Sequence, residues 1–297
     1  MALALVVASA AFAEKATPEE RAARDYSTWL PAQGDWSIGF SLDPIATFVG
    51  NMFNNSTFNT LTDLGGESLS AFNRPLVSFM GTYMLSDQLS VRGNVGLVLG
   101  WKNDKQYVQD DAQLLLNPLS HAKVIDHYNS LTTGGSISLG VEYRVGKTRP
   151  VQGVFGGGLM YEFDVNQDKY AYGNAISDWN QLPSEAYGAI VSVPVPYYTG
   201  GGRVLRNYDA IMNHTVGLYG SVGIEWFVAP KIALGANVNL LLAYTIKDQR
   251  FQDVEGWNTI TDQRETWTEL IKPRHGELNF GSSNIGANLY MAFYFGK

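Results

Sequence analysis

Histidine and serine are the residue types in this chain that could support hydrolytic chemistry. The candidates are His121, His127, His214, His275, Ser282 and Ser283. A serine beside a histidine that a carboxylate orients is the arrangement used by acyl-transfer enzymes. His275 precedes the two serines by only a few residues, so such an arrangement is geometrically conceivable. No local motif surrounds any of these residues, which favours their interpretation as polar residues near strand ends.

Two further stretches have part of a ligand-binding pattern. Residues 164–168 have the oxygen spacing that begins a calcium loop, but Lys169 replaces the expected glycine and Ala175 replaces the closing glutamate. Residues 199–203 are glycine-rich but lack the spacing and the lysine of a phosphate-binding loop. Both are therefore predicted to be surface loops, and the sequence predicts no cofactor and no metal.

Composition limits the class of protein to which this chain can belong. The 297 residues are 45% hydrophobic, 12% aromatic and 16% charged, so charged residues fall below the usual quarter of a globular domain. The net charge of -7 argues against nucleic acid as a partner. The absence of cysteine excludes disulfides and thiolate metal sites. No apolar run is long enough for a membrane helix, so membrane residence would require strands.

The N-terminal part is predicted to lie outside the main domain. Residues 1–13 are an apolar stretch that ends in a small-residue cleavage pattern, which is typical of a secretory signal peptide. Residues 14–34 are predicted to form a periplasmic segment with a short helix over 17–30, because Thr17 and Pro18 are a favourable helix start. The main domain is then 35–297.

The main domain contains eight runs in which apolar residues alternate with small or polar ones. The runs cover residues 36–48, 76–85, 89–101, 137–145, 151–163, 216–226, 232–244 and 283–297. This period of two is that of strands with one apolar face. Tight turns alternate with long polar stretches, at 50–73, 102–133, 164–211 and 247–282. An up-and-down transmembrane barrel has this alternation, with short turns at one end and long loops at the other.

The small or polar residues of each run form one face of the strand, which we call the minor face. Charged residues on this face decide which side of the strands meets lipid. They are Asp43, Arg92, Glu142, Arg144, Glu162 and Glu225. So many charges are too costly for the apolar core of a soluble protein, but they can pair as a polar network in a lumen. Eight strands leave room only for side chains, so this lumen is predicted to be plugged. A soluble secreted barrel with its polar face outward stays open as an alternative.

Aromatic residues on the apolar face are predicted to form two girdles at the membrane interfaces. The girdle residues are Trp36, Tyr83, Tyr143, Trp226, Phe293 and Phe295 at the periplasmic end, with Trp101 and Tyr244 at the outer end.

A family resemblance follows from the export signal, the eight runs and the C-terminal stretch from Leu289 to Phe295. Together they resemble the outer-membrane β-barrel superfamily of Gram-negative bacteria, including its C-terminal assembly signal, although Gly296 and Lys297 follow here. Residues 36–54 are similar to small Bacteroidota-type barrels of uncharacterised function. The resemblance implies a porin-like all-β fold in the cell envelope: an eight-stranded antiparallel up-and-down barrel in the outer membrane. It also implies contact with outer-membrane lipids and with the barrel-assembly machinery.

The long polar stretches carry many aromatic residues, which leaves two interpretations open. The rings are Tyr107, Tyr128, Tyr170, Tyr172, Trp179, Tyr187, Tyr197, Tyr198, Tyr208, Trp257 and Trp267. They could bind a protein or glycan partner, or they could pack the loops into an ordered cap. We expect a structural, accessory or binding protein without catalytic activity. The alternatives are a small selective channel and, because similar family members modify lipid A, an outer-leaflet deacylase or acyltransferase.

Overall fold

The fold is one antiparallel β-sheet with a single short helix in the part that the structure describes, which confirms the all-β prediction. The computed structural model describes residues 26–41, 77–146, 149–187, 190–191, 197–199, 201–281 and 287–296. Its elements are β1 (Trp36–Ser41), β2 (Val77–Met84), β3 (Leu89–Gln109), α4 (Asp111–Leu116), β4 (Lys123–Val145), β5 (Val151–Ala171), β6 (Ile190–Val191), β7 (Gly202–Ala229), β8 (Ile232–Lys247), β9 (Arg250–Asn258), β10 (Gln263–Lys272), β11 (His275–Gly281) and β12 (Ala287–Phe295). Within these ranges no helix is long or apolar enough to cross a membrane.

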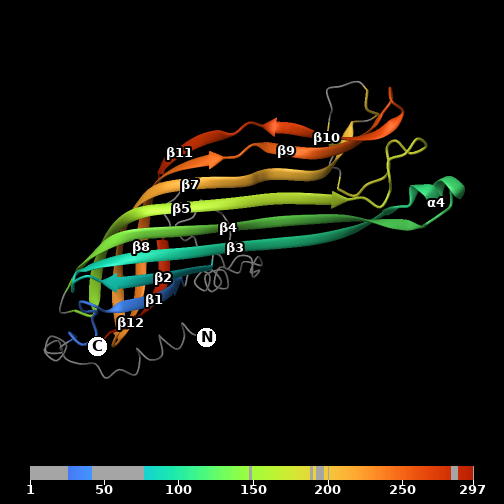
Figure 1. The fold of residues 1–297 in the computed structure, drawn as a ribbon. Coiled ribbons are helices and arrows are strands. Elements are labelled where there is room, and N and C mark those ends of the chain that lie inside the picture. The colour runs from blue at the N-terminus through green and yellow to red at the C-terminus, as the bar shows by residue number, and fades with distance from the viewer. Residues whose placement is uncertain are drawn as a thin grey trace.

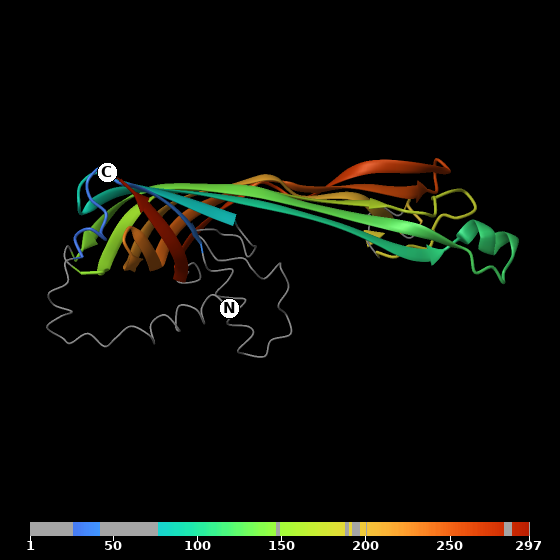
Figure 2. The same cartoon turned by 90° about the horizontal axis from the view of Figure 1, so that it is seen from below.

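Eight strands pair in a closed cycle, which we call the ring. Its spatial order is β1, β2, β3, β4, β5, β7, β8 and β12, and β12 pairs with β1 to complete it. Every pairing in the cycle is antiparallel. Figure 2 shows the sheet curling over on itself at the end that holds the C-terminus.

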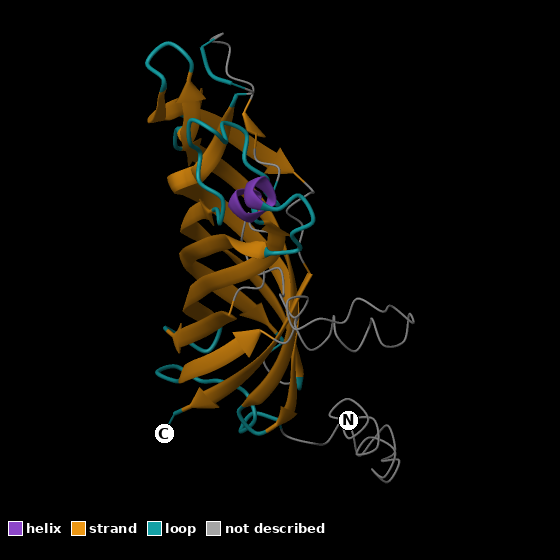
Figure 3. Cartoon of the chain, turned by 90° about the vertical axis from the view of Figure 1, so that its right-hand side faces the viewer, coloured by secondary structure: helices purple, strands orange, loops and turns teal. Residues whose placement is uncertain are grey.

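Four ring strands continue far beyond the ring. β3, β4, β5 and β7 are 21, 23, 21 and 28 residues long, and β9 and β10 widen their outer part on the β7 side. We call this outer part, with α4 at its tip, the extension (Figure 1); its strands and the loops at its tip are also seen in Figure 3. Three stretches were predicted to be long loops: 102–133, 164–211 and 247–282. The first and third are therefore largely strand, and the second is strand at both of its ends. Pairing satisfies their backbone groups, which a loop of such length would leave without regular partners. The predicted loop 50–73 lies outside the described residues.

The strands outnumber the eight predicted runs because part of the outer sheet is interrupted. Only Asp248 and Gln249 separate β8 from β9, and both strands pair with β7. Pro273 and Arg274 separate β10 from β11, and β11 and β12 pair with successive parts of β8. Proline lacks the N–H that a ladder position requires, which accounts for the second interruption.

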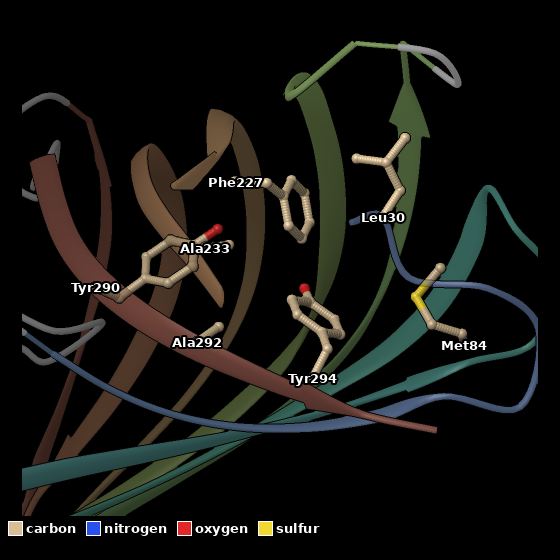
Figure 4. Packing of buried hydrophobic residues seen from close by; sticks show 7 residues of the cluster. All are labelled: Leu30, Met84, Phe227, Ala233, Tyr290, Ala292 and Tyr294. Atoms are coloured by element: carbon tan, nitrogen blue, oxygen red, sulfur yellow. The ribbon is translucent and has the colours of Figure 1, made fainter. Parts of the chain in front are cut away.

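An apolar cluster fills the interior of the ring near the short turns (Figure 4). It consists of Leu30, Met84, Phe227, Ala233, Tyr290, Ala292 and Tyr294. Leu30 comes from the segment before β1, which is anchored by Lys231: the Lys231 ammonium donates to the Leu30 carbonyl at 2.9 Å and contacts Asp35 at 2.5 Å. The described end of the predicted helix is a turn, closed by a hydrogen bond from Trp29 to Tyr26. Residues 1–25, with the signal peptide, lie outside the described part.

Candidate functional site

Four of the six charges predicted on the minor face meet inside the ring. Arg92 of β3 pairs with Glu142 of β4 at 3.0 Å and with Glu225 of β7 at 2.8 Å. Arg144 of β4 pairs with Glu225 and lies 3.7 Å from Glu142. None of the four residues is more than 5% exposed. Two arginines and two glutamates thus form a buried cluster without net charge, which we call the charge cluster.

Two tyrosines of β12 complete the charge cluster. Tyr290 and Tyr294 donate their hydroxyl hydrogens to the two oxygens of Glu225, at 2.7 and 3.0 Å. The guanidinium of Arg92 lies 4.9 Å from the centre of the Tyr290 ring, and that of Arg144 lies 5.4 Å from the Tyr294 ring. Sequence reasoning did not assign these tyrosines to the network, and their place on the polar face of the last strand was the available signal. Charged hydrogen bonds and ring contacts together offset the cost of removing these ions from water.

Buried side chains of the described residues adjoin the charge cluster on two sides. The apolar cluster adjoins it on the side of the short turns, since Tyr290 and Tyr294 belong to both groups. Met160, Leu241 and Ala243 pack with Tyr219 on the other side. A Cβ at Gly235 would overlap the Tyr290 ring, so glycine is required at this position.

Glu162, a fifth predicted network residue, lies apart from the charge cluster. Glu162 is buried on the same inner face, where it lies opposite Ser136 and Thr215 in the neighbouring strands, further toward the extension. Asp43 lies outside the described residues.

The predicted girdle residues lie on the outward face of the ring. Trp36 lies opposite Tyr83 in the register and its ring stacks on that of Phe295, with centroids 4.7 Å apart. Tyr143 and Trp226 are exposed at the same end as these three, and Phe293 contacts Phe40 through a stacked pair. Trp101 and Tyr244 are exposed at the opposite end of the ring.

The candidate catalytic histidines are not brought together. The His214 ring lies on the outer face, where its Nδ1 and the Tyr161 hydroxyl are 2.8 Å apart. His275 lines a pocket with Asn213, and consecutive strand residues such as Asn213 and His214 point to opposite faces. His121 and His127 belong to the extension, and Ser282 and Ser283 lie outside the described residues. Among the described residues, no group of three or more histidines, aspartates and glutamates could hold a metal ion.

Both stretches that were predicted to be surface loops contribute residues to the sheet. Residues 164–168 belong to β5, where Asp164 accepts hydrogen bonds from Asn166 and Asn213. Arg203 is buried at the start of β7, where it pairs with Glu255 at 2.7 Å. The partners of Arg203 come from distant parts of the sequence, so the glycines before it gave no sign of this burial.

A segment over residues 173–187, which we call the cap, folds back onto the extension. Asp126, which is fully buried in β4, accepts the backbone N–H of Gly173 at 2.7 Å and that of Ala186 at 2.9 Å. Asp111 of α4 accepts the Ser184 N–H and the Asn180 amide, both at 2.8 Å. The cap is thus fastened to β4 and to the helix at the tip.

Four of the aromatic residues that were predicted in loops pack together where the cap meets the strands of the extension. The Tyr128 ring contacts those of Tyr170 and Tyr187, with centroids 5.1 and 5.6 Å apart, and Tyr172 stacks on Tyr170. Burial raises the pKa of Tyr170 to about 12. These four rings pack against one another, as the packing alternative predicts, whereas Trp179 in the middle of the cap is half exposed.

The cap is expected to respond to pH through Glu185. Burial and the nearby Asp126 raise the pKa of Glu185, and Arg203 opposes this rise. Because the pKa of this acid is raised in the folded state, its stabilising contribution is complete below its ordinary pKa near 4.5 and is lost as pH rises through the raised value. Hydrogen exchange of peptides from 173–187, corrected for intrinsic rates, should therefore show greater protection in mild acid than at neutral pH. Glu185→Gln cannot ionise and should remove this difference, so an equal pH dependence in the variant would contradict the assignment.

Two solved structures are similar to this chain over most of its length. The crystal structure of a major outer membrane protein from Thermus thermophilus matches 89% of this chain and 100% of that chain, with 11% sequence identity and a TM-score of 0.37. The crystal structure of the outer membrane protein OprG from Pseudomonas aeruginosa matches 91% of this chain and 99% of that chain, with 11% identity and a TM-score of 0.30. No protein-family model and no curated protein matches the chain. The functional conclusion therefore rests on the chain's own residues.

Proposed function

We propose that this chain is a bacterial outer-membrane protein whose ring is an eight-stranded transmembrane β-barrel. The outward face of the ring supports this, because Ile137, Leu139 and Val141 of β4 are 55%, 61% and 49% exposed while Glu142 is buried. Exposure of so much apolar surface to water is unfavourable, by roughly 25 cal/mol per Å². Contact with the acyl chains of a bilayer removes that cost, and the buried charges then face inward.

The length of the apolar band also supports a membrane span. On β3 the outward apolar residues run from Leu89 to the exposed Trp101. At about 3.3 Å per residue and a tilt of about 45°, this stretch covers roughly 28 Å along the membrane normal, close to the thickness of a hydrocarbon core. The short turns then lie in the periplasm and the extension lies outside the cell, as in other barrels of this kind.

The function that the geometry supports best is binding by the extension above a closed barrel, in a structural or accessory role. The single observation that carries it is the extension itself, which runs past the apolar band as an ordered, capped sheet. The interior, in contrast, holds the charge cluster and the apolar cluster, which fill the space that a diffusion pore would need. Ligands or partners therefore meet the protein at its outer end.

The orientation can be tested in cells by placing an epitope tag in the exposed turn between β9 and β10, at residues 259–262. Intact cells should bind the antibody, and the purified protein should migrate differently on gels before and after boiling. A tag that becomes accessible only after lysis would contradict the orientation, and identical migration would contradict the barrel.

A closed lumen predicts that the protein conducts no ions. In planar bilayers the wild type should give flat current traces, because buried ion pairs and tightly packed rings occupy the interior. A general diffusion porin measured in the same bilayers provides the positive control. Steady open-channel steps from the wild type would favour the small selective channel instead.

A further inference from the structure

A pocket forms at the place where the outer sheet is interrupted. It lies beside the break between β8 and β9 and the break between β10 and β11. It is lined by Asn213, Lys247, Asp248, Arg250, Lys272, His275 and Glu277. The proposed function assigns no role to these residues beyond their place at the outer end of the barrel.

The pocket opens on the inner side of the sheet. Asn213 lies in β7 next to the outward His214, and its amide donates to Asp164, which shares the face of the buried Glu162. Ile246 of β8 lies opposite the outward His214, so the next residue, Lys247, points to the inner face. Lys247 lies opposite His275 in the register. The pocket is therefore at the mouth of the ring, at the edge of the apolar band, and it faces water and not the lipid.

The charges of the pocket favour an anion. Three permanent cations and two carboxylates line it, which gives a net charge of +1 in a chain whose net charge is -7. Glu277 is already engaged, since the Lys247 ammonium lies 2.8 Å from one of its oxygens and the His275 ring lies 3.5 Å from the other. This hydrogen bond from Lys247 lowers the pKa of Glu277, so the carboxylate stays ionised at neutral pH.

Two of the cations face each other across neighbouring strands. Lys272 of β10 is the register partner of Arg250 of β9, directly after an irregularity in the ladder. A doubly charged anion placed between two cations is attracted to both of them. An arginine fork and a lysine ammonium are also the two side chains that recognise phosphate most effectively.

We propose that this pocket binds the phosphate group of a small phosphorylated solute that approaches from outside the cell. The inference rests on the proposed function only for the side of the membrane from which the solute comes. A phosphorylated lipid headgroup shares the same chemistry, but the pocket opens away from the outer leaflet. Soluble phosphate esters are therefore the class that it fits.

The test is a calorimetric titration of the full-length protein in detergent with glucose 6-phosphate, inorganic phosphate, glucose and lipid A. Arg250→Gln and Lys272→Gln each remove one cation, and Lys123→Gln removes an exposed cation near α4 as the matched control. Loss of one charge-assisted contact should weaken the binding of glucose 6-phosphate about tenfold or more. Gel mobility before and after boiling shows that each variant is folded.

The site is supported if both soluble phosphates bind and glucose does not. The two pocket variants, but not Lys123→Gln, should also weaken the binding of the phosphates. Equal weakening by the control would overturn it, because that result indicates nonspecific attraction. Binding of lipid A alone would also overturn it. A heat-modifiable protein that binds no phosphate disproves this site and leaves the proposed barrel intact.

Discussion

Glu225→Gln is expected to lower the free energy of unfolding by about 3–5 kcal/mol, the range for breaking a buried ion pair by removal of one partner. Glu225 is fully buried and accepts from two arginines and two tyrosines. Without its charge, Arg92 and Arg144 keep only Glu142 as a carboxylate partner, so the charge cluster carries one uncompensated positive charge. Urea unfolding of the protein in lipid vesicles, followed by tryptophan fluorescence, measures the effect.

The control for this prediction is Asp262→Asn, which removes the same charge from an exposed turn. Asp262 has a φ of 54°, a conformation that asparagine also tolerates, so its replacement should change stability by less than about 0.5 kcal/mol. A double variant, Arg144→Met with Glu225→Leu, should lose less stability than the two single changes added together, because neither charge is left without its partner. Additive losses, or a loss below about 1 kcal/mol for Glu225→Gln, would contradict the assigned importance of the charge cluster.

The alternation of apolar and polar residues predicted the ring because its two faces meet different surroundings. On β4, Leu139 is exposed and Glu142 is buried, so every second side chain reports which way the strand faces. The same alternation placed Arg92, Glu142, Arg144 and Glu225 on one face. It did not predict which of them would pair, since Arg92 and Glu225 are 133 residues apart in the chain.

The extension could not be predicted in this way. Beyond Trp101 and Leu131 both faces of the strands carry many polar or tyrosine side chains, so the contrast between the faces fades and the sequence has the character of a loop. The anchors of the extension are also distant in sequence, since Arg203 and Glu255 are 52 residues apart and Asp126 and Ala186 are 60 apart. These stretches form a sheet because their backbone N–H and C=O groups need hydrogen-bond partners. A pattern of side-chain hydropathy contains no information about that need.

A second large effect is expected in the extension, where contacts between residues distant in sequence hold the cap in place. Asp126→Ala should release the cap without unfolding the ring, because the side chain holds both ends of the segment through Gly173 and Ala186. Its removal leaves two backbone N–H groups without their acceptor, and each such loss costs about 1–3 kcal/mol. The local free energy of opening over 173–187 should therefore fall by about 2–6 kcal/mol. Hydrogen exchange of peptides from this segment measures the change directly.

Comparison of variants separates this anchoring role from a general loss of stability. Asp126→Asn keeps one acceptor oxygen and should give roughly half of the effect, whereas Asp178→Ala removes only a hydrogen bond to the next residue, Trp179, and should leave the segment closed. Replacement of the Asp126 charge also removes a neighbour that raises the pKa of Glu185, so the pH dependence of protection should weaken in Asp126→Asn. Unchanged exchange in Asp126→Ala, or equal exchange in Asp178→Ala, would show that other contacts hold the cap. Urea unfolding of the ring should be the same in all three variants, since their contacts belong to the extension and the charge cluster is untouched.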